Sequence, residues 1–474
     1  MAGRPNRRFE LVWPFASLAV ALACGGEPAP APPDLLLITV DTLRADRLGC
    51  YGGESDVGRA ICRLGEEGTR YVWAVSPAPS TAPAIASILT SRYPSSHGVS
   101  QFASTFLPDG ASTVAELLRA AGYDTAAFIC NPGLNHTRRL DQGFDLYDED
   151  LERSEIGGSL LLERDAETVT NAAIYWISQA SRPWFLWIHY QDPHGPYHPP
   201  DAPRARDVSG HPRLPLLVDH SGHGGIPAYQ ALPDVFTASA YQERYLDEIR
   251  YLDVHVGRLV DLVDRADDRP GILLTSDHGE AFGEDDFWFA HGHSVGLDQI
   301  RVPLFWRPPG APVVGEVQTP VTTLDIAPTL LAAAGIEQPA EFQGRVLPTA
   351  GDQGLPAYSD RALFSEHRLR AGVIAGRVYF ARDREPLSAP VEDRITGGSL
   401  PPLPPRSARL SYGGKLPGYE PRAAGGPASD AREARPLETL LADFLEAAGD
   451  PSLSHTGELP DQRREELRAL GYLE

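Results

Sequence analysis

Hydrophobic residues follow two alternating patterns along the chain from residue 34 onward. Continuous apolar runs of strand length are typical of strands buried on both faces of a parallel sheet. Such runs cover residues 34–40, 125–129, 184–189, 272–275 and 302–306. Between them, apolar residues recur at helical spacing over residues 113–121, 166–180, 241–266 and 323–334. Strands that alternate with helices predict an α/β fold with a large, mostly parallel sheet flanked by helices.

The C-terminal part of the chain has a different pattern. We expect the α/β domain to cover residues 34–350 and a smaller subdomain to cover residues 351–474, with short β-prone pieces such as residues 373–381. Residues 384–437 are rich in Pro, Gly, Ala and Arg and have little periodicity, which predicts a long irregular segment. Helical spacing over residues 460–473 predicts a short terminal helix.

The N-terminus has the pattern of an export signal. Three arginines precede an apolar stretch from Leu11 to Ala23, which is too short to cross a bilayer core of about 30 Å as a helix. Residues 1–23 therefore read as a signal peptide. Because Cys24 follows a small residue, the junction resembles a lipoprotein processing site, and residues 24–33 form a Pro-rich tether. We expect an exported bacterial lipoprotein on the periplasmic side or in the outer membrane, with simple secretion as the alternative.

Charge and cysteine content exclude some classes of function. The 474 residues carry 42 Lys and Arg against 64 Asp and Glu, a net charge of -22, which argues against nucleic acid as a partner. Cys50, Cys62 and Cys130 have no spacing that indicates a disulfide framework or a zinc site. We expect them to be small buried residues, and a Cys50–Cys62 bridge remains an alternative.

Acidic residues follow several of the predicted strands. Asp41, Asp192 and Asp277 each come just after an apolar run, and the carboxyl ends of parallel strands meet at one edge of a sheet. Asp277 and His278 together offer an oxygen and an imidazole to one metal ion. As alternatives, Asp41 caps a helix and Asp277 only ends a strand.

A hydroxyl group stands at the predicted start of a helix. Thr81 precedes Ala82 and Pro83, and Pro is tolerated in the first turn of a helix. The hydroxyl would face unpaired N–H groups at the positive end of the helix dipole, where an oxyanion is stabilised. A nearby cation would lower the pKa of the hydroxyl and make it a nucleophile. The alternative is that Thr81 is only the N-cap.

Histidines gather in two polar segments, residues 189–198 and 290–294. Near a cation they could bind an anionic substrate, protonate a leaving group or hold a second metal ion. For a second ion we consider Asp192 with His198 or His293. Each histidine could equally be a surface residue. A Gly- and Pro-rich insertion carries three more, which we interpret as loop residues: His211, His220 and His223.

Six motifs together resemble the sulfatase family of the alkaline phosphatase superfamily. They occur in the family's order over residues 37–52, 88–99, 115–123, 192–197, 276–280 and 300–304. The resemblance implies an alkaline-phosphatase-like α/β sandwich around a mixed sheet, with a smaller C-terminal antiparallel sheet. It also implies that Asp41, Asp277 and His278 bind a cation.

The same resemblance assigns further roles. It places Thr81 at the position of the family's nucleophile, where its oxygen would complete the cation site. It makes His194 and either His291 or His293 residues that bind the anion or protonate the leaving group. Oxygen ligands suit one Ca²⁺, Mg²⁺ or Mn²⁺ ion, and His278 keeps Zn²⁺ as an alternative.

Three positions depart from the family pattern. Sulfatases carry Cys-x-Pro-x-Arg, whose Cys becomes formylglycine, whereas this chain has Thr81 and Ile85 at the Cys and Arg positions. Thr42 replaces a second Asp after Asp41, and Asn131 lies near the place of a Lys-x-His pair that is absent. We therefore expect no formylglycine.

The sequence predicts a metal-dependent hydrolase that cleaves the sulfate, phosphate or phosphonate group of an anionic ester through Thr81. Hydrolysis of a phospho-Thr ester by water is a more familiar reaction than hydrolysis of a sulfo-Thr ester. This difference favours a phosphate or phosphonate substrate. The alternatives are a phospho-group transferase of the same superfamily and a non-catalytic, sulfatase-like binding lipoprotein. The lipid on Cys24 would be the membrane partner, and the sequence assigns no oligomeric state.

Overall fold

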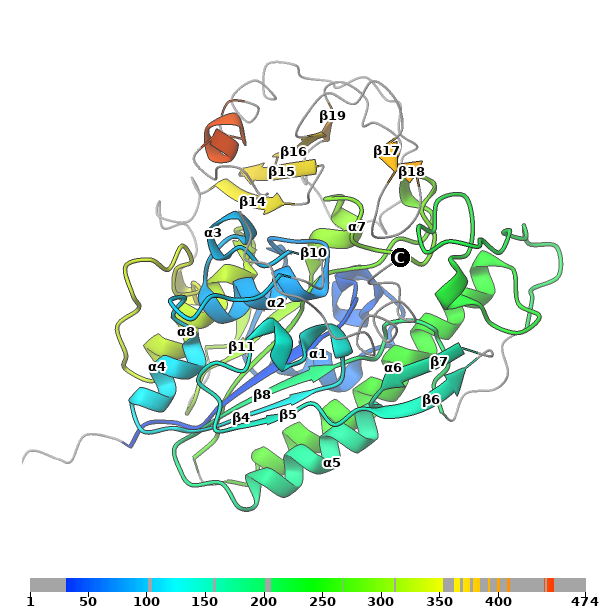
Figure 1. Cartoon of the computed structure of the whole chain (residues 1–474). Helices are drawn as coiled ribbons and strands as arrows, with labels where there is room; N and C mark the ends of the chain where they lie inside the picture. The colour runs from blue at the N-terminus through cyan, green and yellow to red at the C-terminus, as the bar shows by residue number, and fades with distance from the viewer. Residues whose placement is uncertain are drawn as a thin grey trace, which may run out of the picture. The chain divides into compact units, whose positions relative to one another are not determined.

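The computed structural model describes residues 31–352, apart from 101–104, 157–158, 201–205, 267 and 311–312, and short stretches between residues 362 and 446 (Figure 1). The chain divides into residues 1–31 and residues 32–474, and the described elements belong to the second unit. The predicted signal peptide (1–23), Cys24, most of the tether and the predicted terminal helix (460–473) lie outside the described residues. No helix among the described residues is long and apolar enough to cross a membrane.

The main sheet has eight strands in the order β12-β2-β11-β9-β1-β8-β4-β5. The central strands β9, β1, β8 and β4 are parallel to one another, and β11 is antiparallel to both of its neighbours. In sheet order, the strands are β12 (Gly315–Val317), β2 (Thr69–Tyr71), β11 (Leu304–Arg307), β9 (Gly271–Ser276), β1 (Leu35–Val40), β8 (Trp184–Tyr190), β4 (Asp124–Ile129) and β5 (Leu146–Asp148). The predicted α/β class with a mostly parallel mixed sheet is confirmed.

One predicted strand is divided in the structure. The run over residues 302–306 becomes β10 (Arg301–Val302) and β11. Pro303 stands between them, and proline has no N–H to donate to a strand ladder. β10 therefore leaves the main sheet and joins a three-stranded sheet with β3 (Ala74–Val75) and β13 (Val321–Thr322).

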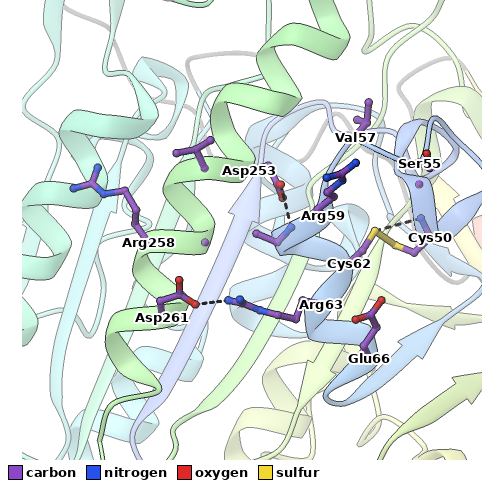
Figure 2. A pocket seen from close by; sticks show the side chains of 14 residues that line it. Cys50, Ser55, Val57, Arg59, Cys62, Arg63, Glu66, Asp253, Arg258 and Asp261 are labelled. Atoms are coloured by element: carbon purple, nitrogen blue, oxygen red, sulfur yellow. Dashed lines mark hydrogen bonds and ion pairs between the residues drawn. A yellow bond between two sulfur atoms is a disulfide. The ribbon is translucent and has the colours of Figure 1, made fainter.

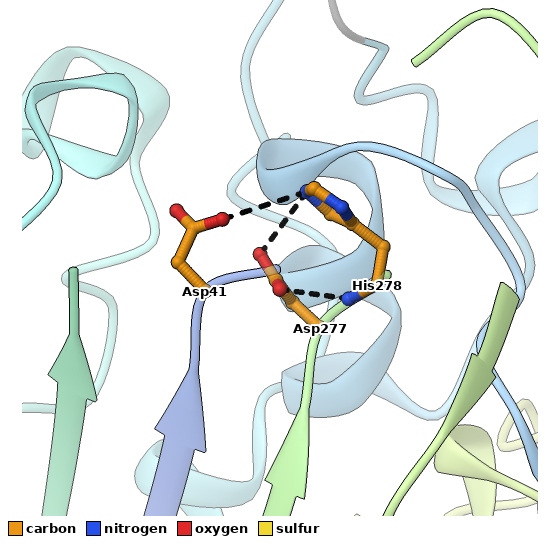
Figure 3. Close-up of side chains that lie close together, drawn as sticks. All are labelled: Asp41, Asp277 and His278. Atoms are coloured by element: carbon orange, nitrogen blue, oxygen red, sulfur yellow. Dashed lines mark hydrogen bonds and ion pairs between the residues drawn. The ribbon is translucent and has the colours of Figure 1, made fainter. Parts of the chain in front are cut away.

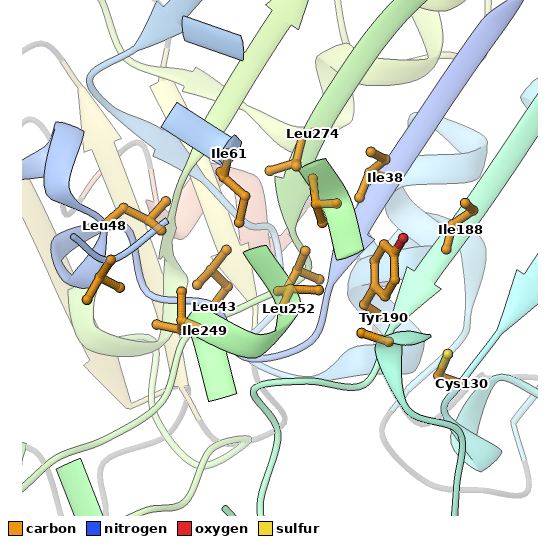
Figure 4. Close-up of a cluster of buried hydrophobic side chains, with 14 of the residues drawn as sticks. Ile38, Leu43, Leu48, Ile61, Cys130, Ile188, Tyr190, Ile249, Leu252 and Leu274 are labelled. Atoms are coloured by element: carbon orange, nitrogen blue, oxygen red, sulfur yellow. The ribbon is translucent and has the colours of Figure 1, made fainter. Parts of the chain in front are cut away.

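Helices cover both faces of the main sheet. Alternate residues of β1 point to opposite faces, so Ile38 and its even-numbered neighbours pack with one helical layer and Leu37 with the other. The first layer consists of α1 (Arg59–Glu66), α5 (Ala166–Ile177) and α6 (Ala238–Val263), and Figure 4 shows part of its core. The second consists of α2 (Thr81–Thr90), α4 (Val114–Ala120) and α8 (Ile326–Ala333).

The predicted helices occur, with shifted ends. α6 begins three residues before the predicted start at 241, and α5 ends three residues before the predicted end at 180. The predicted helix over 323–334 begins with a 3₁₀ turn, η7 (Thr323–Asp325), before α8. Local hydrophobic spacing does not register the caps and turns that end a helix. Two short helices and a hairpin complete this region: α3 (Pro94–His97), α7 (Leu297–Ile300), β6 (Glu152–Ile156) and β7 (Ser159–Glu163).

The C-terminal part forms the smaller antiparallel sheet that the resemblance implies. Its strands are β14 (Ala362–Glu366), β15 (Arg370–Ala375), β16 (Val378–Asp383) and β19 (Ser407–Arg409). A separate pair consists of β17 (Val391–Glu392) and β18 (Ser399–Leu400). The described residues of the segment 384–437 therefore contain short strands, where the sequence predicted only irregular chain.

Two cysteines form a disulfide. Cys50 and Cys62 are bonded across a sequence separation of 12 residues, whereas Cys130 is free and buried. Cys62 and Cys130 are buried as expected, whereas Cys50 is only partly buried, and the alternative of a Cys50–Cys62 bridge is correct. The bond joins the turn after β1 to α1, a proximity that the tertiary fold creates.

Candidate active site

Two acidic residues stand side by side at the carboxyl edge of the main sheet. β1 and β9 are neighbours with Val40 opposite Ser276, so the next residues, Asp41 and Asp277, emerge together. His278 follows directly, and Figure 3 shows the three side chains converging. All three are completely buried, and one potential ligand atom from each lies within 4.8 Å of the others. Parallel strand ends thus produce the group of ligands.

Each carboxylate in this group uses one oxygen within the protein and leaves the other without a donor. Asp277 Oδ1 accepts the backbone N–H groups of Thr42 (3.2 Å) and His278 (2.7 Å). Asp41 Oδ2 accepts Nδ2 of Asn131 at 2.6 Å. In the described part of the chain, Asp41 Oδ1 and Asp277 Oδ2 have no hydrogen-bond partner. They lie 3.7 and 3.5 Å from Nε2 of His278.

The tautomer of His278 follows from its second nitrogen. Nδ1 lies 2.9 Å from the carbonyl oxygen of Gly279, so Nδ1 carries the proton and donates it. Nε2 is then left with a lone pair that faces both carboxylates. Two buried carboxylate oxygens and an imidazole lone pair that face one another fit a divalent cation, because without one their mutual repulsion is uncompensated.

The titration behaviour of the group agrees with this fit. Burial raises the pKa of Asp277 well above its usual range, and the charge of Asp41 raises it further. Burial also acts to raise the pKa of Asp41, but the nearby imidazole of His194 and the contact with His189 hold it below its usual range. Burial, together with His291, lowers the pKa of His278 to about 3. His278 is therefore neutral at physiological pH, as a metal ligand must be.

Thr81 begins helix α2 beside this group. Its Oγ1 lies 3.2 Å from Nε2 of His278 and donates a hydrogen bond to Asp41 Oδ2 at 3.5 Å. Ser80, with extended backbone angles, is the N-cap and Thr81 is the first helical residue, so the alternative that Thr81 is itself the N-cap is wrong. Asp41 likewise caps no helix, because Arg44 is the N-cap of the next 3₁₀ turn.

Ile85 occupies the position of the family's arginine. Its side chain is completely buried in the apolar core between the sheet and helices α2, α4 and α8. This part of α2 consequently contributes no cationic side chain to the group around Thr81.

Two of the predicted histidines lie near this group. The ring of His291 lies 4.5 Å from that of His278, and the ring of His194 lies 5.1 Å from that of His291. Nδ1 of His291 lies 3.3 Å from Oε1 of Glu280. Burial acts to lower the pKa of His291, but the charge and the hydrogen bond of Glu280 raise it above its ordinary value. Burial lowers the pKa of His194, whose Nδ1 lies 2.7 Å from the carbonyl oxygen of Gly195.

The third predicted histidine has other neighbours. His293 stacks on Phe287 with ring centroids 3.7 Å apart, and its Nε2 lies 2.8 Å from Nε2 of Gln299. Among the described residues, the only group of three or more clustered metal-binding side chains is Asp41, Asp277 and His278. That group does not include Asp192, His198 or His293, the residues considered for a second ion.

The loop histidines also have defined neighbours. The ring of His220 lies 5.6 Å from that of Tyr229, which in turn lies 6.2 Å from His194. His223 contacts Phe287. His211 is exposed, in agreement with its interpretation as a loop residue.

Sequence reasoning gave no role to Glu280, and it gave His189 only the general role shared by the histidines of residues 189–198. The sequence placed His189 at the end of the predicted strand 184–189 and at the start of the polar segment 189–198. In the structure it is the penultimate residue of β8, with Nε2 3.5 Å from Asp41 Oδ2. Glu280 is completely buried and accepts the hydroxyl of Tyr197 at 3.2 Å as well as contacting His291. The available signal for His189 was the alternation of strand side chains, since it shares a face with Trp187.

A hollow of about 790 Å³ opens elsewhere on the protein (Figure 2). The disulfide lines it, and several of its charged groups have partners: Arg63 pairs with Asp261 at 2.6 Å, and Asp253 accepts backbone N–H groups of α1. None of the three clustered ligands lines this hollow.

Comparison with known proteins places the chain in a family. The family model "Sulfatase" matches residues 33–336. An N-acetylglucosamine-6-O-sulfatase of Bacteroides thetaiotaomicron is 25% identical over 73% of this chain and 75% of its own length. A choline-sulfatase of Rhizobium meliloti is 29% identical over 64% of this chain and 68% of its own length.

Solved structures share the fold. The phosphonate monoester hydrolase of Agrobacterium radiobacter aligns with a TM-score of 0.64 and 20% identity, covering 91% of this chain and 98% of that one. A protein in complex with its substrate D-glucosamine-2-N,6-O-disulfate aligns with a TM-score of 0.65 and 17% identity, covering 89% and 99%. The family match spans more than half of this chain and includes Asp41 and Asp277. This protein therefore belongs to the sulfatase family of the alkaline phosphatase superfamily and is a hydrolase of sulfuric or phosphoric esters.

Proposed function

We propose that this protein is a divalent-cation-dependent hydrolase in which Thr81 attacks the sulfur or phosphorus atom of an anionic ester. One observation carries the proposal: Oγ1 of Thr81, at the N-terminus of a ten-residue helix, lies 3.2 Å from Nε2 of His278 and 3.5 Å from Asp41. A hydroxyl in a buried group of metal-binding side chains is the arrangement that a nucleophile of this type requires.

The cation would be held by Asp41, Asp277, His278 and the Thr81 oxygen. When bound, it supplies positive charge that lowers the pKa of the hydroxyl and offsets charge on the ester. The two carboxylate oxygens favour Ca²⁺, Mg²⁺ or Mn²⁺, and the imidazole of His278 allows Zn²⁺.

The residues around Thr81 would orient the nucleophile, bind the anion and protonate the leaving group. The hydroxyl donates a hydrogen bond to Asp41 Oδ2, which orients the lone pairs of Oγ1 for attack. The N-terminus of α2 favours the negative charge of the bound anion. His291, held by Glu280 through Nδ1, presents Nε2 to donate a proton to the leaving oxygen, and the adjacent His194 binds the anion.

We further propose that the transferred group is a phosphate or phosphonate rather than a sulfate. With Thr81 in place of the formylglycine precursor, water must attack the Thr ester itself. Hydrolysis of a phospho-Thr ester is the more accessible of the two reactions. The structural similarity to phosphonate monoester hydrolases supports this choice.

The test compares the purified protein with Thr81→Ala and Thr81→Ser. Rates are measured on aryl sulfate, phosphate monoester, phosphate diester and phosphonate substrates, each with Ca²⁺, Mg²⁺, Mn²⁺ and Zn²⁺. We expect Thr81→Ala to lose turnover by at least about 10³-fold with an unchanged circular dichroism spectrum. We expect Thr81→Ser, which keeps a hydroxyl, to retain measurable activity.

Mass spectrometry of quenched reactions supplies the second readout. We expect a phosphorylated or phosphonylated Thr81 peptide in the native protein and none in Thr81→Ala. Undiminished rates in Thr81→Ala would refute the nucleophile. Transfer of the group to an added alcohol in preference to water would identify a transferase.

We also propose that the protein is exported and anchored by a lipid on Cys24. The disulfide between Cys50 and Cys62 supports export, because such bonds persist in oxidising compartments. Expression with its own leader in a Gram-negative host, followed by mass spectrometry of the mature N-terminus, tests this. A diacylated Cys24 is expected, and an unmodified N-terminus in the periplasm would indicate simple secretion.

A further inference from the structure

His189 lies on the sheet face that carries Thr81. It is the direct register partner of Thr39 in the neighbouring strand β1. It shares a face with Trp187, which packs in the core under helix α2. The side chain of His189 is completely buried, and its Nε2 lies 3.5 Å from Asp41 Oδ2, the oxygen to which Thr81 donates.

A chain of hydrogen bonds is compatible with a proton on Nε2 of His189. Nε1 of Trp187 can only donate, and it donates to Oγ1 of Thr39 at 2.9 Å. The hydroxyl of Thr39 lies 2.9 Å from Nδ1 of His189 and 3.4 Å from the carbonyl oxygen of Ile188. The Thr39 hydroxyl can donate to either acceptor. When it donates to Nδ1 over the shorter distance, the proton of His189 lies on Nε2.

The opposite tautomer is unfavourable. With the proton on Nδ1 alone, the Nε2 lone pair would face the carboxylate of Asp41 at 3.5 Å, and two electron-rich atoms would repel each other. Nε2 therefore carries an N–H group directed toward Asp41.

This N–H group lacks a good acceptor. Within the described residues, Nε2 of His189 has no hydrogen-bond partner, and its acidic neighbour Asp41 Oδ2 lies 3.5 Å away. Asp41 Oδ2 already receives Asn131 at 2.6 Å. A buried donor without an acceptor costs free energy, so such a donor beside a nucleophile indicates a group that arrives with the substrate.

We propose that Nε2–H of His189 donates directly to a non-bridging oxygen of the ester anion bound at Thr81. This rests on the proposed function, since it places the anion beside the Thr81 hydroxyl. His189 then supplies a donor in a site to which Ile85 and Asn131 contribute no charge. It recognises the transferred group rather than the leaving group, because its Nε2 lies 3.5 Å from Asp41 Oδ2, the same oxygen that Thr81 contacts.

The experiment measures anion binding apart from turnover. Inorganic phosphate and inorganic sulfate are titrated by calorimetry into the metal-loaded Thr81→Ala protein, with and without His189→Leu or His189→Gln. We expect His189→Leu to weaken anion binding by about 10-fold or more, the effect of losing a hydrogen bond to a charged group. We expect His189→Gln, which keeps an N–H at similar reach, to weaken it by less than about 3-fold. His136→Leu, which removes an exposed histidine paired with Glu149, is the matched control and should change nothing.

A second measurement separates recognition of the anion from support of Asp41. Metal affinity of His189→Leu is titrated without any anion, and we expect a change of less than about 2-fold. A loss of metal affinity of 10-fold or more, the size that follows when a supporting partner of a ligand is removed, would make His189 a positioning residue for Asp41 and overturn the proposal. Unchanged anion binding would overturn it as well.

Two further outcomes are covered by the design. If His189→Leu does not fold, His189→Asn, which is too short to present its amide at the same place, replaces it with the same expected loss. If the protein with Thr81 mutated still turns over substrate but His189→Leu weakens anion binding, the nucleophile assignment fails and the anion contact stands.

Discussion

Oγ1 of Thr81 lies 3.2 Å from Nε2 of His278, although 197 residues separate the two in the sequence. Helix α2 delivers the hydroxyl, and the turn after β9 delivers the imidazole. Because Nδ1 of His278 donates to Gly279, its Nε2 lone pair faces the hydroxyl and both carboxylates. Nε2 of His278 therefore lies within reach of both the proposed nucleophile and the proposed cation.

Removal of one carboxylate should weaken cation binding. In Asp277→Asn the oxygen that lacks a donor loses its charge. We expect metal affinity to fall by at least about 100-fold, because removal of a group that only supports a ligand already costs about 10- to 100-fold. Calorimetric titration of chelator-stripped protein measures this. Asp261→Asn, an exposed carboxylate on α6, is the matched control and should bind metal normally. Equal affinities in the two variants would argue against the cation site.

Stability should depend on pH through His97. This buried histidine accepts the backbone N–H of Val99 at Nδ1 (3.0 Å), and its Nε2 lies 2.9 Å from Ser87 Oγ. Burial, together with Arg92, lowers the pKa of His97 to about 3. The unfolded chain, with a histidine pKa of about 6.5, therefore binds a proton that the folded protein rejects.

This difference in the pKa of His97 makes the free energy of unfolding depend on pH. His97 imposes no penalty above pH 6.5, and the free energy of unfolding falls as the pH decreases from about 6.5 toward 3, by up to about 1.4 kcal/mol per pH unit. Urea denaturation of the native protein and His97→Gln at several pH values between 7 and 5 measures this. We expect a flatter pH dependence in His97→Gln, whereas His136→Gln, at an exposed site, should keep the native slope. Identical slopes in all three proteins would contradict the prediction.

The disulfide should contribute to stability. It closes a loop across a separation of 12 residues, for which the chain-entropy model gives about 3 kcal/mol. We expect a reducing agent to lower the melting temperature of the native protein. The double variant Cys50→Ser, Cys62→Ser should melt at the reduced protein's temperature and should not respond to the reducing agent. A response in that variant would show that the reductant acts elsewhere.

Introducing the family's arginine at position 85 should not produce sulfatase activity. Ile85 is completely buried among apolar side chains, so Ile85→Arg would place a charge there without a partner. We expect Ile85→Arg to lower the free energy of unfolding by at least about 3 kcal/mol and to give no gain in sulfate ester turnover. Ile85→Val, which removes one methylene, should cost only about 1 kcal/mol. Urea denaturation and initial rates check both, and a stable, more active Ile85→Arg protein would contradict this account.

The sequence alone determined the alternation of the central strands with the main helices, the family and the residues of the proposed cation site. These follow from local properties: runs of apolar residues specify strands, and a carboxylate directly after a parallel strand must lie at the sheet's carboxyl edge. Asp41 and Asp277 were accessible to such reasoning because each directly follows its strand.

Only the tertiary structure decided which side chains from different segments come into contact. The direction of His189 depends on its register with Thr39, the Cys50–Cys62 bond depends on α1 folding back beside the turn after β1, and the contact of His293 with Phe287 depends on how its loop returns. Each is a relation between segments far apart in the chain or a feature of loop geometry, and local periodicity carries no information about either.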